Sequence, residues 1–95
     1  MIDTQKSGTV LVVEDDPSVR EIAVHLLKFT GFKVIEATDA KNGLEQFNRN
    51  PNIDLVFSDV IMPGGMSGIE MAKEILVRKP QTPILLATGY AAKAE

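Results

Sequence analysis

Cysteine is absent from the 95 residues of this chain. A disulfide framework and a metal site built on thiolates are therefore both excluded. No apolar segment approaches the roughly 18 residues that a membrane-spanning helix needs. The N-terminal segment, residues 1–8, is short and polar and lacks the apolar centre of a secretory signal peptide. These absences favour a cytoplasmic protein that is held together by a hydrophobic core.

An excess of positive charge is also missing. The formal net charge is -3, which argues against electrostatic binding to nucleic acid. The composition, 44% hydrophobic and 24% charged, is typical of a globular protein. Because the chain is short, we expect residues 1–95 to form one domain with one modest core.

Apolar segments rich in β-branched residues alternate with segments of helical periodicity. We expect strands at residues 9–13, 33–37, 53–59 and 83–87, helices at 17–30, 40–48 and 67–79, and the first turn of another helix at 91–95. Asp16, Asp39 and Ser67 stand where helix N-caps are expected. Short connections between strands and helices predict an α/β fold with a parallel sheet, right-handed crossovers and helices on both faces.

Apolar residues at spacings of three and four predict which side of each helix faces the sheet. The predicted stripes are Val19, Ile22, Ala23, Leu26 and Phe29 in the first helix, Leu44 and Phe47 in the second, and Ile69, Ala72, Ile75 and Leu76 in the third.

Carboxylates follow two of the predicted strands. Glu14 and Asp15 come directly after the first strand, and Asp59 ends the third, which is almost continuously apolar. If these strands are neighbours, the three carboxylates converge at the edge where ligands collect in open parallel sheets. Like charges raise one another's pKa, and a hard divalent cation such as Mg²⁺ would relieve that repulsion.

A carboxylate beside such an ion can attack phosphorus and form an aspartyl phosphate. Thr88, directly after the last predicted strand, could offer its hydroxyl to a phosphate oxygen. A simpler interpretation of Asp59 alone is that it ends a strand and caps a turn. Asp16 is better explained as a helix cap than as a metal ligand.

Three segments, residues 12–17, 54–64 and 84–89, resemble the receiver domain of two-component response regulators. The resemblance implies a flavodoxin-like, doubly wound parallel sheet whose strands here follow the order 2-1-3-4. It implies that Asp59 is the phosphoacceptor and Thr88 the switch hydroxyl. It further implies Mg²⁺ as cofactor, bound by Glu14, Asp15, Asp59 and the backbone carbonyl of Ile61. The phosphoryl donor would be a sensor histidine kinase or a phosphotransfer protein, and the chain would be a switch rather than an enzyme.

The chain departs from that family after its fourth strand. The fifth strand, the lysine that follows it and the fifth helix have no counterpart, and Lys93 comes too soon after Thr88 to be that lysine. We therefore expect a receiver truncated at its C-terminus, with impaired phosphorylation. The fourth strand would be an open edge and one sheet face partly bare, so self-association is expected there.

Two other functions are compatible with the residues. One is an interaction module that is not phosphorylated, in which the acidic pocket only binds metal or tunes stability. The other is an aspartyl-phosphate hydrolase with its own small substrate. That class tends to carry a second Asp two residues after the nucleophile, and Ile61 occupies that position here, so it ranks last.

Overall fold

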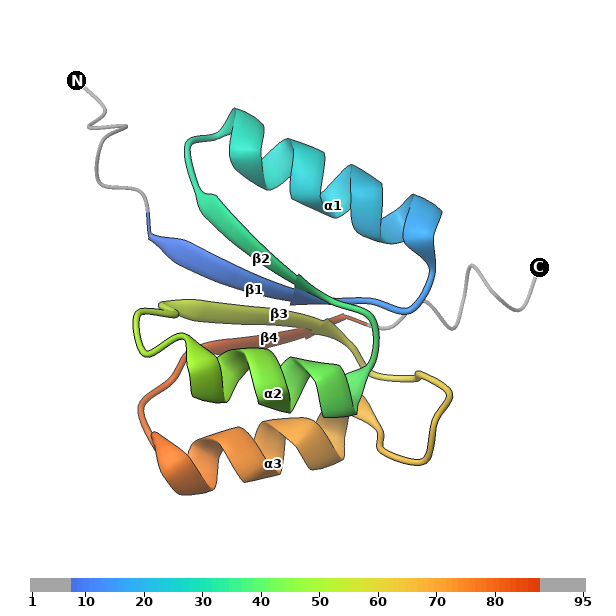
Figure 1. Ribbon diagram of the computed structural model, residues 1–95, viewed down its shortest axis with the longest axis vertical. Coiled ribbons are helices and arrows are strands. Elements are labelled where there is room, and N and C mark those ends of the chain that lie inside the picture. The colour runs from blue at the N-terminus through green and yellow to red at the C-terminus, as the bar shows by residue number, and fades with distance from the viewer. Residues whose placement is uncertain (1–7, 88–95) are drawn as a thin grey trace.

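The computed structural model describes residues 8–87 (Figure 1). Its elements, in chain order, are β1 (Thr9–Val13), α1 (Pro17–Phe29), β2 (Lys33–Ala37), α2 (Ala40–Arg49), β3 (Leu55–Asp59), α3 (Gly68–Arg78) and β4 (Ile84–Ala87). This order confirms the predicted alternation of strand and helix. The helical turn predicted at residues 91–95 lies outside the described residues.

The four strands form one parallel sheet in the order β2-β1-β3-β4. β1 is central: Val10 pairs with Val34 of β2 on one side and with Leu55 of β3 on the other. Figure 1 shows α1 on one face of the sheet and α2 and α3 on the other. Both the predicted sheet order and the predicted placement of helices on two faces are confirmed.

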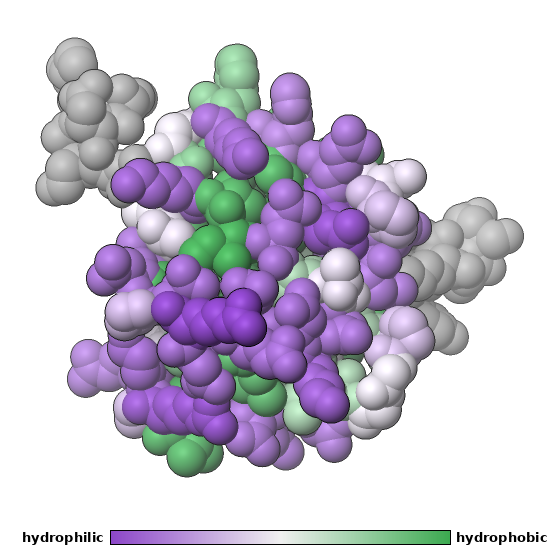
Figure 2. Space-filling view, viewed as in Figure 1, coloured by the Kyte–Doolittle hydropathy of each residue, from purple (hydrophilic) through white to green (hydrophobic). Residues whose placement is uncertain are grey.

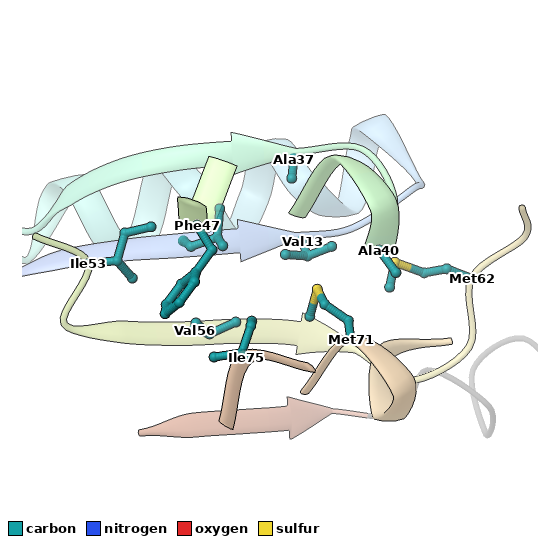
Figure 3. Packing of buried hydrophobic residues seen from close by; sticks show 10 residues of the cluster. Val13, Ala37, Ala40, Phe47, Ile53, Val56, Met62, Met71 and Ile75 are labelled. Carbon is teal, nitrogen blue, oxygen red and sulfur yellow. The ribbon is translucent and has the colours of Figure 1, made fainter. Parts of the chain in front are cut away.

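Alternate residues of β1 supply the cores of the two faces. Leu11 and Val13 point into the larger cluster, beneath α2 and α3, where Phe47, Met71 and Ile75 are also buried (Figure 3). Val10 and Val12 belong to a smaller cluster beneath α1. A central strand buried on both faces explains the uninterrupted apolar run in its sequence.

The predicted inward stripe of α1 is wrong except for Ala23. Val24 is the buried residue of this helix, with Ala23 and Leu27 packed beside it. The other members of the predicted stripe are largely exposed: Val19 48%, Ile22 62%, Leu26 58% and Phe29 84%. Because the apolar residues of α1 cover more than half of its circumference, periodicity alone could not identify the side that faces the sheet.

The stripe predicted for α3 is only half right, whereas that of α2 is confirmed. In α3, Ala72 and Ile75 are buried together with Met71, while Ile69 and Leu76 are 45% and 40% exposed. In α2, Phe47 is buried and Leu44 packs against the larger cluster. The face in view in Figure 2 is mostly hydrophilic over α2 and α3, as expected for the outer sides of amphipathic helices.

Candidate metal centre

The carboxyl ends of β1 and β3 lie side by side. Val13 at the end of β1 pairs with Ser58 of β3, so the residues that follow each strand emerge at the same edge of the sheet. One carboxylate oxygen each from Glu14, Asp15 and Asp59 lies within 4.8 Å of the others. The predicted convergence of these three side chains is confirmed.

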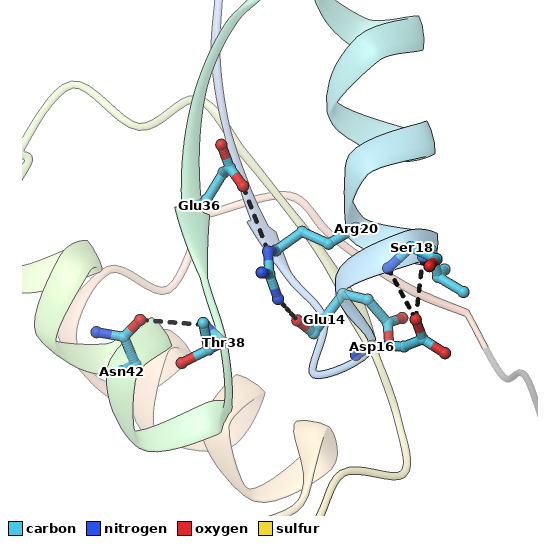
Figure 4. Close-up of polar contacts among 8 residues, drawn as sticks. Glu14, Asp16, Ser18, Arg20, Glu36, Thr38 and Asn42 are labelled. Atoms are coloured by element: carbon cyan, nitrogen blue, oxygen red, sulfur yellow. Dashed lines mark hydrogen bonds and ion pairs between the residues drawn. The ribbon is translucent and has the colours of Figure 1, made fainter.

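Backbone and side-chain hydrogen bonds fix the position of Glu14. Its N–H donates to the Ala37 carbonyl at 3.1 Å, which extends the pairing of β1 with β2 by one bond. Its carbonyl accepts a hydrogen bond of 2.8 Å from Nη1 of Arg20, and its Oε2 accepts one of 3.0 Å from the N–H of Asp16 (Figure 4). The residue is therefore held through three of its polar groups.

Asp16 is a helix cap, as predicted. Its Oδ1 accepts hydrogen bonds from the N–H groups of Ser18 at 2.8 Å and Val19 at 3.3 Å (Figure 4). These bonds satisfy amides at the N-terminus of α1 that have no partner within the helix. The carboxylate of Asp16 is thus committed to α1 and is not part of the acidic cluster.

Asp59 is buried, with 6% of its surface exposed. The chain is constrained directly after it: Val60 N–H donates to the Ala87 carbonyl at 3.0 Å, and Gly68 N–H donates to the Val60 carbonyl at 2.9 Å. A Cβ at Gly68 would overlap the Asp59 backbone carbonyl. Glycine at the start of α3 therefore allows the helix to approach the end of β3.

The cluster is electrostatically unfavourable for its own carboxylates. Burial is the largest cause of a raised pKa at Glu14, and the nearby carboxylates of Asp59 and Asp15 raise it further, against an opposing hydrogen bond from the Asp16 amide. Within the described residues, Oδ1 of Asp15 is buried without a hydrogen-bond partner. Three converging oxygen donors and an unsatisfied carboxylate oxygen fit a hard divalent cation such as Mg²⁺.

Other predicted site residues are less defined. Ile61 lies in the loop after Asp59, and the role of its carbonyl as a ligand stays a prediction. Thr88 lies outside the described residues. Met62 is buried in the larger cluster, 8% exposed.

Sequence reasoning missed two residues that shape the site. Arg20 binds the Glu14 carbonyl, and nothing local in the sequence indicates that contact. Gly68 could have been noticed, because glycine inside a helix-capping box is a poor helix former and indicates a close backbone approach.

The sequence matches the response regulator receiver domain over residues 10–95. A cyclic di-GMP phosphodiesterase of Thermotoga maritima is 42% identical over 82 residues, which cover 86% of this chain and 21% of that protein. The chain therefore spans about a fifth of the length of this relative.

None of the helices in residues 8–87 has both the length and the apolar composition that a membrane span needs.

Solved structures of a response regulator are also similar to this chain. The response regulator TrrA of Thermotoga maritima, in complex with Mg²⁺ and BeF, has a TM-score of 0.82 and 36% identity, covering 90% of this chain and 72% of that one. TrrA in complex with the histidine kinase ThkA gives a TM-score of 0.80 and 37% identity, covering 87% of this chain and 70% of that one. With the family match extending over residues 10–95 and the sheet order shared, this chain belongs to the response regulator receiver domain family.

Proposed function

We propose that this chain is a phosphoacceptor module of a two-component signalling system. It receives a phosphoryl group on Asp59 from a histidine kinase or a phosphotransfer protein, with Mg²⁺ bound. The observation that carries the proposal is the acidic cluster: Asp59 ends β3, is buried, and has carboxylate neighbours within 4.8 Å. TrrA, which is similar to this chain, has been solved both with Mg²⁺ and BeF and with a histidine kinase.

Glu14, Asp15 and Asp59 would hold the cation, with the Ile61 carbonyl as the expected fourth protein ligand. The bound ion supplies positive charge that offsets the negative charge of a phosphoryl group in transfer. The protein itself gathers the three carboxylates at one edge of the sheet. Because the fold keeps these carboxylates close together, binding of a divalent cation between them is favoured.

In the transfer step, a carboxylate oxygen of Asp59 forms a bond to phosphorus as the P–N bond of a phosphohistidine breaks. The imidazole leaves with the bonding electron pair and takes a proton from solvent. Thr88 would then donate its hydroxyl hydrogen to a phosphoryl oxygen, which would couple phosphorylation to the residues that follow β4 in the sequence. In this proposal the chain is a cytoplasmic switch and not an enzyme with a separate substrate.

Acetyl phosphate labelling followed by intact mass spectrometry tests the proposal. In the presence of Mg²⁺ the wild-type chain should gain at most one phosphoryl group, at the impaired level expected from its sequence, and in EDTA it should gain none. Asp59→Asn should gain none. Asp54→Asn is the matched control: Asp54 is exposed, and asparagine keeps an oxygen that can accept the Thr9 N–H, so labelling should persist. Equal labelling of Asp59→Asn and wild type would reject Asp59 as the acceptor.

A second feature supports an interaction function for the same chain. An apolar groove of about 440 Å³ runs between α1 and the strands β1, β3 and β4. Its lining includes Ile22 and Leu26 of α1, Phe57 of β3 and Leu85 of β4, and Leu85 is 55% exposed. Within the described residues, β4 pairs on one side only, with β3. Among residues 8–87, nothing covers this apolar groove or pairs with the outer side of β4, and self-association is expected here.

The proposed occupant of the groove is a second copy of the chain. Val19, Ile22, Leu26 and Leu85 are 48–62% exposed, which amounts to roughly 400 Å² of apolar surface, about half of what one partner contributes to a standard interface. In a two-fold dimer the exposed stripe of α1 from each copy can fill the groove of the other. The same surface is then buried in both copies.

Sedimentation velocity at micromolar concentration tests this. We expect a dimer for the wild type and a monomer for Leu85→Lys, whereas Val77→Lys should still dimerise. Val77 is a matched control because it is 81% exposed on α3, on the other face of the sheet. A wild-type monomer would refute self-association, and a groove that is occupied only when a phosphotransfer protein is added would belong to that partner.

A further inference from the structure

Arg20 connects three parts of the fold at the edge of the acidic cluster. It lies in α1, its Nη1 donates to the Glu14 carbonyl at 2.8 Å, and its Nε lies 3.3 Å from Oε1 of Glu36 in β2 (Figure 4). Its side chain is 18% exposed, whereas that of Glu36 is 49% exposed. A mostly buried guanidinium with two oriented partners is held in place from both sides.

The contact with Glu14 bears on the geometry of the cluster. Glu14 is the residue at which β1 stops pairing with β2, and the direction of its carbonyl sets the path of the backbone into Asp15. Two of the three clustered carboxylates therefore depend on this short backbone segment. Since like charges push these carboxylates apart, a segment without an anchor would relax away from Asp59.

Arg20 provides that anchor without using the carboxylate oxygens. In the structure its guanidinium binds the backbone oxygen of Glu14 and the side chain of Glu36. The oxygens of Glu14, Asp15 and Asp59 that converge are left to a cation. Lysine has one ammonium in place of a planar fork, so it could not reproduce both contacts in the same orientation.

We propose that Arg20 is a positioning residue for the metal centre, acting through the backbone of Glu14, and that Glu36 orients Arg20. This inference rests on the proposed function, because it presumes that the cluster binds Mg²⁺. Groups behind metal ligands typically change metal affinity by about 10–100-fold when they are removed. Arg20→Met should weaken Mg²⁺ binding by about tenfold, at the lower end of that range, because the ligands themselves remain.

The test measures Mg²⁺ affinity by isothermal titration calorimetry and the Mg²⁺ dependence of acetyl phosphate labelling. For Arg20→Met, the Mg²⁺ concentration for half-maximal labelling should rise about tenfold, while the rate at saturating Mg²⁺ stays near that of wild type. Arg20→Lys should restore part of the affinity. Arg49→Met removes an exposed arginine in the last turn of α2 and should leave both values unchanged.

Glu36→Gln is a milder variant that tests the orienting role even if Arg20→Met folds poorly. It should weaken Mg²⁺ binding by about two- to threefold, in keeping with a partly exposed ion pair. Wild-type Mg²⁺ affinity in both Arg20→Met and Glu36→Gln, whatever their melting temperatures, would show that Arg20 is only structural. Failure of the wild type to bind Mg²⁺ would instead overturn the proposed function and this inference together.

Discussion

Replacing Asp59 by asparagine should stabilise the metal-free protein at neutral pH. The substitution preserves shape and removes one of three negative charges whose oxygens lie within 4.8 Å of one another. Two unit charges at that distance repel by about 1 kcal/mol in water and about 3.5 kcal/mol at an effective dielectric constant of 20. Because Glu14 and Asp15 are partly open to solvent, the lower part of that range applies. We expect a gain of about 1–2 kcal/mol in unfolding free energy.

Magnesium should reverse this order. A ligand at about 100 times its Kd stabilises the folded state by about 2.7 kcal/mol, provided that the unfolded chain does not bind it. The wild type should receive most of that stabilisation, whereas Asp59→Asn has lost a charged ligand and should receive little. The variant is therefore expected to be the more stable protein in EDTA and the less stable one in saturating Mg²⁺.

Thermal unfolding followed by circular dichroism measures both halves of the prediction. For a domain of this size, a change of 1 kcal/mol moves the melting temperature by about 4–8 °C, so the crossing of the two proteins is easily resolved. Asp54→Asn, outside the cluster, should show no such reversal. If Asp59→Asn melts below the wild type in EDTA, the three carboxylates do not repel one another as the geometry implies.

Three further changes address other parts of the structure. Folding raises the pKa of Glu14 above its ordinary value of 4.5, so the unfolded chain releases this proton at a lower pH than the folded chain does. The metal-free wild type should therefore lose stability relative to Glu14→Gln as pH rises from the unfolded pKa to the folded pKa. Urea titrations at several pH values measure the difference. Gly68→Ala should cost about 2–3 kcal/mol and weaken Mg²⁺ binding, because α3 must withdraw from the Asp59 carbonyl; denaturant unfolding and calorimetry report these effects. Asp16→Ala should cost about 1 kcal/mol through loss of the α1 cap, with the amide signal of Ser18 in NMR exchanging faster.

Much of the fold could be predicted because it follows from local signals. Strand ends, helix caps and apolar runs each leave a mark within a few residues, and the cap at Asp16 and the carboxylate at the end of β3 were found in this way. The inward side of α1 could not be predicted. Its apolar residues include both the contacts of Val24 with the sheet and the exposed stripe beside the groove, and the sequence does not distinguish a covered apolar side from an open one.

The three carboxylates could be brought together from sequence because the parallel sheet places β1 and β3 at one edge. The residues that support them could not be found in the same way. Arg20 and Glu36 are sixteen residues apart, and their relation to Glu14 depends on how α1 lies across β2. The close approach at Gly68 likewise depends on where α3 starts relative to the end of β3. The sheet topology, which the sequence predicts, places the metal ligands. The packing of the helices places the residues that support them, and the sequence does not show it.

The supports matter because the acidic cluster works against the fold that carries it. Without a cation, burial and repulsion at Glu14 oppose folding, and a looser edge would relieve them. The Arg20 contact holds the backbone that follows β1, and the close approach of α3 at Gly68 holds the backbone at the end of β3. Both contacts resist that relaxation. A bound cation relieves the repulsion between the crowded carboxylates. Mg²⁺ affinity should therefore depend on how firmly this edge of the sheet is held. Loosening either support should therefore lower Mg²⁺ affinity, and in the metal-free protein the repulsion that is relieved should offset only part of the stability lost with the contact.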